Sequence, residues 1–223
     1  MKKLFAAIRK SDLDTIKLLL EKDPSLISCT ATSPKKDAGQ SPLQVALKTD
    51  NAAIANYLLD KGADVNFMES PDCGSNPQAP VLHDAIIASV MNSRWNTYTD
   101  GELTVFGTAE HADESFSLLS RMIEMGADVN AVDSVGNSCL WRAAIQAEQI
   151  LPGYNRSTKE VFKDRLLTYE LAADLSRIFH LLIQHGADVG CIHPYIGVSF
   201  RDYFVSSPPL RSLTAYRQEN IPQ

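Results

Sequence analysis

Hydrophobic side chains recur at helical spacing in three stretches of the chain, and each stretch ends in nearly the same five residues. The stretches are 54–61, 117–125 and 178–185. The pentapeptides that follow them are Gly-Ala-Asp-Val-Asn at 62–66, the same at 126–130, and Gly-Ala-Asp-Val-Gly at 186–190. Glycine adopts the left-handed conformation after a helix without a Cβ clash, and aspartate bonds to amides in the following turn. Three helix stops after three similar helices indicate an internal repeat.

A second pattern lies upstream of each stop and predicts the start of a helix. In Ser41-Pro42-Leu43, serine is a good N-cap, proline suits the first helical position, and leucine begins an apolar stripe. Related hexapeptides occur at 80–85 and 138–143. Each unit therefore reads as a helix start, a first helix, a second helix and a glycine stop.

These motifs resemble the ankyrin repeat, a unit of about 33 residues with a turn and two antiparallel helices. The family's Thr-Pro-Leu-His-x-Ala-Ala pattern matches at 41–47, 80–86 and 138–144, and its Asp-x-x-Gly turn matches at Asp133 and Gly136. The resemblance covers most of the chain in a broken form. It implies an all-α fold, an ankyrin-repeat solenoid of about five helix pairs whose connections form hairpin-like fingers.

We interpret residues 1–223 as one ankyrin-repeat domain with two atypical ends. Its expected parts are an N-terminal cap at 1–27, a repeat at 28–66, two longer repeats at 67–130 and 131–190, and a C-terminal cap at 191–223. The apolar residues expected to fill the last cap are Phe200, Tyr203, Phe204, Leu210, Leu213 and Tyr216. Terminal repeats need a polar outer face, and the lysines of the first helix fit that need.

The third and fourth repeats each contain an insertion between their two helices. The first insertion, 92–110, contains Asp100-Gly101 between β-forming residues, which predicts a hairpin. The second, 151–170, is expected to extend the following helix, so that one helix runs from Ser157 to Gln184. Adjacent repeats stack in parallel, so we expect the insertions to form one lobe away from the fingers. The lobe either stabilises the two repeats or adds a binding surface.

Six residues are candidates for contact with a partner. They are Phe67 and Met68 in the second finger, Trp95, Tyr98 and Phe106 in the first insertion, and Trp141 at the position of the motif's histidine. The finger residues, which extend to Pro71 and Cys73, have finger-to-finger packing as an alternative. Trp141 belongs either to the core under the insertions or to the concave face. The resemblance implies structural hydrogen bonds for His83, which occupies the motif's histidine position.

Charge and composition exclude several classes of protein. The chain has 223 residues and a formal charge of −6, and a general nucleic-acid binder is normally basic. The apolar run near Met1 is too short for a signal-peptide core, and no stretch has the length of a membrane span. The four cysteines lack Cys-x-x-Cys spacing, so we expect reduced thiols in a cytoplasmic protein. We also expect a monomer.

The expected function is protein binding through the concave groove, the fingers and the inserted lobe, because the resemblance implies no catalytic activity. One concrete form is an inhibitor or immunity-type protein that holds a toxin or effector, with which the acidic charge is compatible. No metal or cofactor is expected, and the partner's identity is open. The alternative is an enzyme with an acid–base site in the insertions. Its candidate residues are Asp100, Glu102, His111, Asp113 and Glu114.

Overall fold

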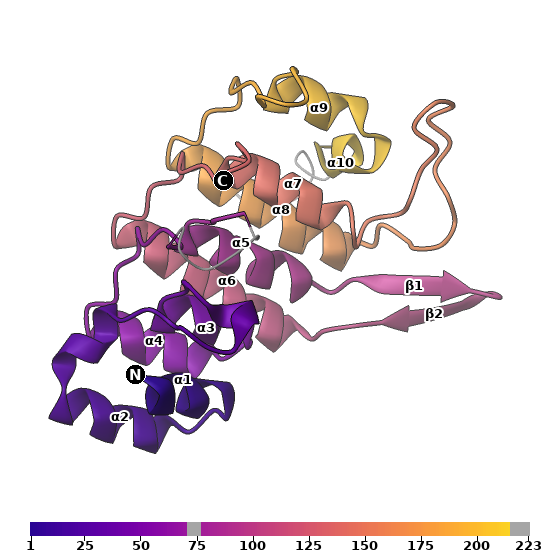
Figure 1. Ribbon diagram of the computed structural model, residues 1–223. Helices are drawn as coiled ribbons and strands as arrows, with labels where there is room; N and C mark the ends of the chain where they lie inside the picture. Colours follow the sequence, from indigo (N-terminus) through magenta and orange to yellow (C-terminus); the bar gives the residue numbers. More distant parts are fainter. Residues whose placement is uncertain (71–76, 215–223) are drawn as a thin grey trace, which may run out of the picture.

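The computed structural model describes residues 1–70 and 77–214 (Figure 1). Its helices are α1 (Lys2–Arg9), α2 (Leu13–Lys22), α3 (Pro42–Lys48), α4 (Ala52–Asp60), α5 (Val81–Met91), α6 (Ala109–Glu124), α7 (Cys139–Ala147), α8 (Tyr169–Gln184), α9 (Phe200–Ser206) and α10 (Pro208–Ser212). Two short 3-10 segments follow α2, and one hairpin is formed by β1 (Asn96–Thr99) and β2 (Glu102–Val105). The described fold is therefore mostly helical, with one small sheet.

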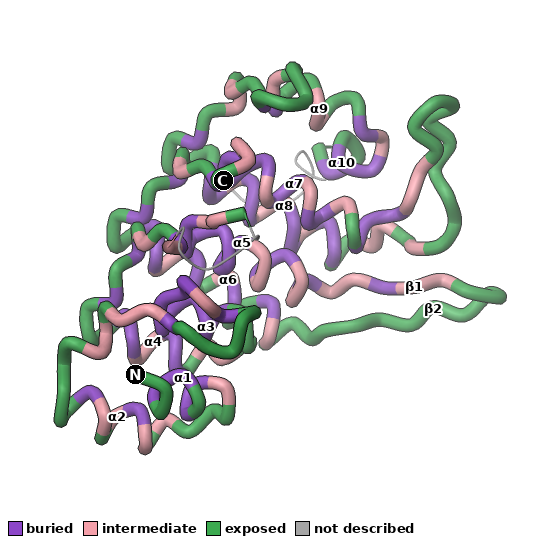
Figure 2. The backbone as a smooth tube through the Cα atoms, in the orientation of Figure 1, coloured by how far each residue is buried: buried purple, intermediate pink, exposed green. Residues whose placement is uncertain are grey.

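The helices stack in two layers. Consecutive helices contact one another as pairs, from α1 with α2 to α9 with α10. The first members contact each other in order, α1, α3, α5, α7 and α9, and α4, α6 and α8 form the second layer behind them. Figure 2 shows that buried positions run along α3 to α8, whereas the hairpin and the loop before α8 are mostly exposed. One continuous core therefore runs through the stack.

The predicted helix starts are confirmed where serine precedes the helix. The Ser41 side chain accepts the amide of Gln44, and the Gln44 side chain accepts the amide of Ser41, which is a reciprocal capping box. Ser138 and Ser199 cap α7 and α9 in the same position. The helix α9 therefore begins at Phe200, whose side chain is buried as expected. Tyr216 lies outside the described residues.

The predicted helix stops are confirmed as well. Gly62, Gly126 and Gly186 have φ angles of +84°, +93° and +92°. A Cβ at any of them would meet no atom within 4 Å, so the backbone conformation alone favours glycine. The aspartate two residues later turns the chain: Asp64 accepts the amide of Asn66 at 2.8 Å, and the later copies repeat this bond.

The asparagine of the pentapeptide links one unit to the next. Asn66 donates to the Gly126 carbonyl at 3.0 Å and accepts the Asp128 amide at 2.8 Å. Asn130 makes the same two bonds to Gly186 and Asp188, at 2.9 and 2.8 Å. The third copy has Gly190 instead, and no further Gly-Ala-Asp turn follows it in the chain. The pentapeptide thus ends in asparagine in the two copies that are followed by another Gly-Ala-Asp turn, to which the asparagine side chain bonds.

The first insertion contains the predicted hairpin. β1 pairs with β2 in antiparallel fashion, with Asn96 opposite Val105 and Thr99 opposite Glu102. Asp100 and Gly101 have φ angles of +53° and +87°, as a type I′ turn requires. The hairpin projects away from the helices at the side opposite the turns that follow the pentapeptides (Figure 1).

The predicted helix from Ser157 to Gln184 is wrong in its first half. The helix α8 begins at Tyr169, where Thr168 caps it, and the residues before it form an irregular loop. Asn155 accepts the amides of Ser157 and Thr158, and Lys159 has a φ of +63°, so the chain reverses instead of winding into a helix. Val161 and Phe162 are 44% and 50% exposed. Helical spacing does not make a helix where no layer buries the stripe.

Candidate binding surfaces

Three apolar side chains occupy the same place in three successive fingers. Met68, Val132 and Ile192 each lie two residues after the last residue of a pentapeptide. Each forms an isolated antiparallel bridge to the residue that precedes the next first-layer helix, at Pro80, Ser138 and Ser199. They are 44%, 51% and 69% exposed. The repeat thus places an apolar side chain in solvent at one position per finger.

The last finger extends this set with two further residues. Tyr195 is 78% exposed and Ile196 is 50% exposed. His193 holds their main chain, because its Nδ1 lies 3.2 Å from the Tyr195 amide and 3.4 Å from the Ile196 amide. Since Nδ1 accepts these bonds, Nε2 carries the proton and donates to Asn137 Oδ1 at 3.1 Å. We call Met68, Val132, Ile192, Tyr195 and Ile196 the finger row.

A series of hydrogen bonds between buried polar side chains connects the finger row to the helices. Asn137 donates to Asp133 at 2.7 Å, and Arg142 on α7 donates to the same carboxylate at 2.5 Å. Burial opposes ionisation of Asp133, but the hydrogen bonds from Asn137 and the Arg142 charge lower its pKa below the usual value. The carboxylate therefore stays charged and holds the third finger to α7.

The third and fourth fingers also contact each other directly. A Cβ on Gly136, whose φ is +84°, would come within 2.3 Å of Pro194 Cγ. Only glycine therefore fits this contact. Between the second and third fingers, the Ser134 amide donates to the Gln78 carbonyl, and the Gln78 amide donates to the Ser134 hydroxyl, both at 2.9 Å. The fingers form one continuous surface.

The predicted finger and concave-face residues differ in how far they are exposed. Met68 is exposed, whereas Phe67 is half-buried and packs against the core. Trp141 is 0% exposed, with its ring 5.0 Å from His193 and 4.6 Å from Tyr203 between centroids. Trp141 therefore belongs to the core, which was one of its two alternatives, and packs against the last finger and α9. A binding role for it is wrong. Pro71 and Cys73 lie outside the described residues.

The expectation for His83 is supported in part. It is buried as implied, and the polar group that acts on its ring is the backbone of Ala131 in the next finger, at a geometry short of a full hydrogen bond. Burial, assisted by the nearby Arg142 charge, lowers its pKa to about 4. His83 is therefore a neutral core side chain at neutral pH.

Sequence reasoning missed four of the five finger-row residues. Val132 and Ile192 follow the pentapeptide at the same distance as Met68, so the repeat itself was the available signal. Tyr195 and Ile196 stand in the middle of Pro-Tyr-Ile-Gly, where a turn normally carries small polar residues. Since turns lie at the surface, large apolar residues in such a turn indicate that their side chains are exposed to solvent.

Segments 92–110 and 151–170 contact each other, as predicted. Asn96 is 0% exposed, and it donates to the Leu166 carbonyl and accepts the Leu166 amide, both at 2.8 Å. The Tyr98 amide donates to the Asp164 carbonyl at 2.8 Å. Trp95 stacks on Phe106 with centroids 4.3 Å apart. The hairpin and the loop before α8 therefore form one lobe, in which Trp95 and Tyr98 are half-buried and Phe106 is 38% exposed.

An ion pair anchors the lobe to the stack. Arg94 Nε and Nη2 donate to the two oxygens of Asp174 on α8 at 2.8 and 2.9 Å, and the Arg94 amide donates at 3.0 Å. Asp174 is 2% exposed. The bidentate geometry fixes the start of the hairpin against a helix of the next pair.

The candidate acid–base residues do not form one site. Asp100 and Glu102 lie at the tip of the hairpin, which projects away from α6 (Figure 1). On α6, His111 Nε2 lies 2.9 Å from Asp50, and Asp113 pairs with Arg177 at 2.5 Å. Within the described ranges, no cluster of three or more histidine, cysteine or acidic side chains has the arrangement of a metal site.

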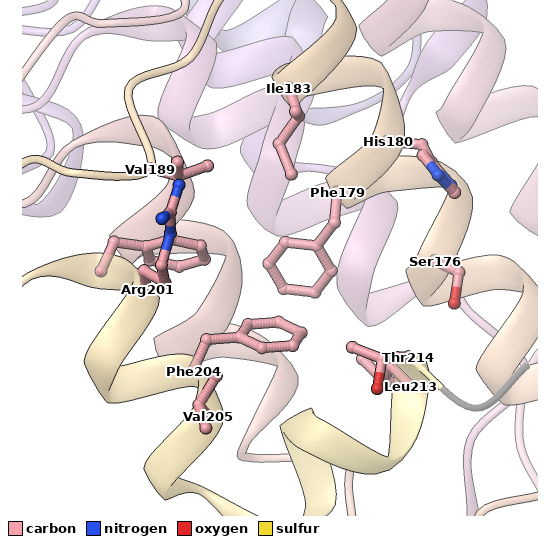
Figure 3. A pocket seen from close by; sticks show the side chains of 11 residues that line it. Ser176, Phe179, His180, Ile183, Val189, Arg201, Phe204, Val205, Leu213 and Thr214 are labelled. Carbon is pink, nitrogen blue, oxygen red and sulfur yellow. The ribbon is translucent and has the colours of Figure 1, made fainter. Parts of the chain in front are cut away.

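A cavity of about 290 Å³ lies between α8 and the two last helices. Figure 3 shows Phe179 of α8 and Phe204 of α9 facing one another across it, with Leu213 and Thr214 on one side and Arg201 at the edge. The lining is mostly apolar and holds no acid–base pair. Thr214 is the last residue that the structure describes.

Comparison with known proteins agrees with this architecture. The family model for ankyrin repeats in three copies matches residues 2–69, which include α1 to α4. Residues 2–69 are therefore ankyrin repeats. Ankyrin repeats are generally protein–protein interaction modules and are typically not enzymes. No curated protein matches the chain. None of the helices among the described residues combines the length and apolarity needed to cross a bilayer.

Proposed function

We propose that the protein binds a partner protein through the finger row. The observation that carries the proposal is the exposed apolar side chain at the same position of three successive fingers, continued by Tyr195. We interpret the five helix pairs as five repeats, the first and last being caps, so that the row follows the axis of the stack. A few large anchors, tyrosine among them, supply most of the energy in protein interfaces, and Tyr195 is such a residue.

The first-layer helices support placing the binding surface on the fingers. Their polar side chains bond to each other: Gln44 donates to Asp84 at 2.9 Å, and Lys48 lies 2.9 Å from Glu69 and 3.6 Å from Asp84. Burial raises the pKa of Asp84 to about 6, although Lys48 acts against this. These polar groups are already bonded to one another. The apolar side chains of the finger row are instead exposed to solvent in the described structure.

A finer form of the proposal is an inhibitor or immunity-type protein that holds a toxin or effector. The formal charge of −6 favours a basic partner. The surface then includes Phe67 beside Met68 at one end of the row. Trp95, Tyr98 and Phe106 belong to the lobe on the opposite side of the stack and form a second part of the surface.

The test compares a finger variant with a matched control in the full chain. The variant Ile192→Ser/Tyr195→Ser removes two anchors, and Leu18→Ser removes an equally exposed leucine on α2. Partners are recovered from the native host, identified by mass spectrometry, purified and titrated against each variant. We expect about a hundredfold weaker binding for the finger variant, unchanged binding for the control, and unchanged melting temperatures for both. Equal binding by the finger variant would refute the proposal.

A further inference from the structure

The hairpin has two edges, and the chain itself covers one of them. On the β1 edge, the Tyr98 amide donates to the Asp164 carbonyl at 2.8 Å, and Asn96 bonds twice to the main chain of Leu166. A segment of the second insertion therefore lies along β1. The hairpin already holds one neighbouring segment, through the Tyr98 amide and the Asn96 side chain.

The backbone groups on the opposite edge follow from the register. Antiparallel strands alternate between pairs that exchange hydrogen bonds and pairs that do not. Because the Tyr98 amide points away from β2, the pair of Tyr98 with Leu103 is of the second kind, and so is the pair of Asn96 with Val105. The Phe106 amide donates to the Trp95 carbonyl at 2.7 Å, which agrees with this alternation.

The amide and carbonyl groups of Leu103 and Val105 therefore point away from β1. No hydrogen bond to them occurs within residues 1–70 and 77–214. The strand β2 contains no proline, lysine or bulge, which are common protections of an exposed edge. Its backbone is open to another extended segment.

The side chains at this edge are apolar. Leu103 and Val105 are 44% and 54% exposed. They lie on one face of the hairpin together with Tyr98, while Thr97 and Thr104 lie on the other face. An added strand would meet free backbone groups and an apolar face at the same two residues.

The charged side chains on the hairpin itself, Asp100 and Glu102, are of one sign. Between Arg94 and Arg121 the sequence contains no lysine or arginine. It contains five acidic residues, Asp100, Glu102, Glu110, Asp113 and Glu114. Asp100 and Glu102 flank the start of β2 itself. An occupant with basic ends is favoured over an acidic one, and a second copy of this chain would bring a second acidic hairpin.

We propose that the β2 edge binds an extended segment of a partner protein, which alternates apolar residues and carries lysine or arginine at its ends. The segment adds as a third strand through the main chain of Leu103 and Val105. The finger row lies at the opposite side of the stack (Figure 1), so this surface is independent of the one proposed there.

The first experiment uses a synthetic peptide that alternates valine and threonine between terminal lysines, and a second peptide with glutamate in place of lysine. Both are titrated against the full chain, with amide exchange followed by NMR. We expect the lysine peptide to slow exchange of the Leu103 and Val105 amides at least about tenfold, with Thr104, already bonded to β1, unchanged. The glutamate peptide should bind about tenfold more weakly. Absence of protection at Leu103 and Val105 overturns the proposal.

The second experiment removes one outward donor. Val105→Pro deletes an amide that faces solvent, a position where an edge strand tolerates proline. We expect about a tenfold loss of affinity for the lysine peptide, whereas Val105→Thr, which keeps the amide, should lose much less. Undiminished binding by Val105→Pro overturns the proposal. If this variant does not fold, the amide-exchange experiment on the original chain decides. A concentration-dependent dimer that protects both amides without peptide would overturn it in favour of a second copy. Ile192→Ser/Tyr195→Ser should leave peptide binding unchanged.

Discussion

The two sides of the helix stack are held together in different ways. On the finger side, Asn66 and Asn130 make the same pair of hydrogen bonds to the next turn, with lengths that agree within 0.1 Å. On the lobe side, Asn96 and Arg94 each make contacts that occur once. A repeated sequence produces repeated contacts, whereas the insertions are joined by contacts that no other repeat contains.

The two sides also differ in burial. The bonds of Asn66 and Asn130 are exposed to water, while Asn96 and Asp174 are 0% and 2% exposed. A buried polar group that loses its partner is more costly than an exposed one, because water cannot replace the bond. Individual contacts of the lobe should therefore contribute more to stability than the contacts that define the repeat.

Removing the lobe's ion pair should have the largest effect. Arg94→Met leaves the buried Asp174 with Arg177 at 3.3 Å as its remaining cation. We expect the free energy of unfolding to fall by about 3 kcal/mol, because the buried Asp174 carboxylate loses two hydrogen bonds and the nearer of its two cations. Urea denaturation measures the change. Arg121→Met is the control, since its partner Asp60 has a 62% exposed side chain, and it should cost less than about 1 kcal/mol. Equal losses would contradict the comparison.

Asn96→Ala should cost about 2 kcal/mol, because the Leu166 amide and carbonyl both lose their partner beneath the hairpin. Thermal unfolding provides the measurement. Thr99→Ala, at an exposed position of the same strand, serves as the control and should change stability by less than about 0.5 kcal/mol. If Asn96→Ala is as mild as this control, the lobe is not held by its buried bonds.

Acid should weaken the stack through His83. Its pKa is lowered to about 4 from an ordinary value of 6.5, so the unfolded chain binds more protons than the folded chain between these values. This contribution to stability falls as the pH drops through that window, by about 2 kcal/mol between pH 7 and pH 5. Asp84, with its pKa raised to about 6, acts in the opposite sense.

The difference between the original chain and His83→Gln isolates the histidine, because Asp84 is present in both. Glutamine is the residue at the equivalent position, Gln44, one helix pair earlier. Urea denaturation at several pH values should show the original chain losing stability relative to the variant from pH 7 to pH 5. Parallel curves for the two proteins would show that His83 does not titrate as described.

The smallest effects are expected on the finger side. Asn66→Ala and Asn130→Ala should each cost about 1 kcal/mol, and the double variant about twice as much, because the two sites share no partner. Gly190→Asn restores the pentapeptide where no further turn follows, so it should not stabilise the protein. A gain from this substitution would mean that the asparagine acts within its own turn and not between turns.

The outcome for individual elements shows where sequence reasoning succeeded. The turns at Gly62, Gly126 and Gly186, the caps at Ser41 and Ser138, and the hairpin turn at Asp100-Gly101 depend on short local rules. Such rules act within a few residues and hold wherever the chain places them. The contact between the insertions followed from the stacking of repeats.

The failures share a different cause. The residues from Ser157 to Thr168 have helical spacing, but no layer covers them, and the local turn at Asn155 prevails. The choice between core and concave face stayed open for Trp141, because the pattern does not say how far α9 reaches over α7. Tyr195 and Ile196 were missed because their exposure depends on His193 and Asn137, which are 56 residues apart.

The sequence by itself determined where helices begin and stop, because capping and left-handed turns are settled by neighbouring residues. It also determined the order of the pairs, since the pentapeptide and its asparagine recur. The tertiary structure alone decided which apolar residues are covered. Exposure of the finger row and the open edge of β2 depends on which segments come to lie beside them. Those contacts join residues far apart in the chain, so local capping and turn rules do not determine them.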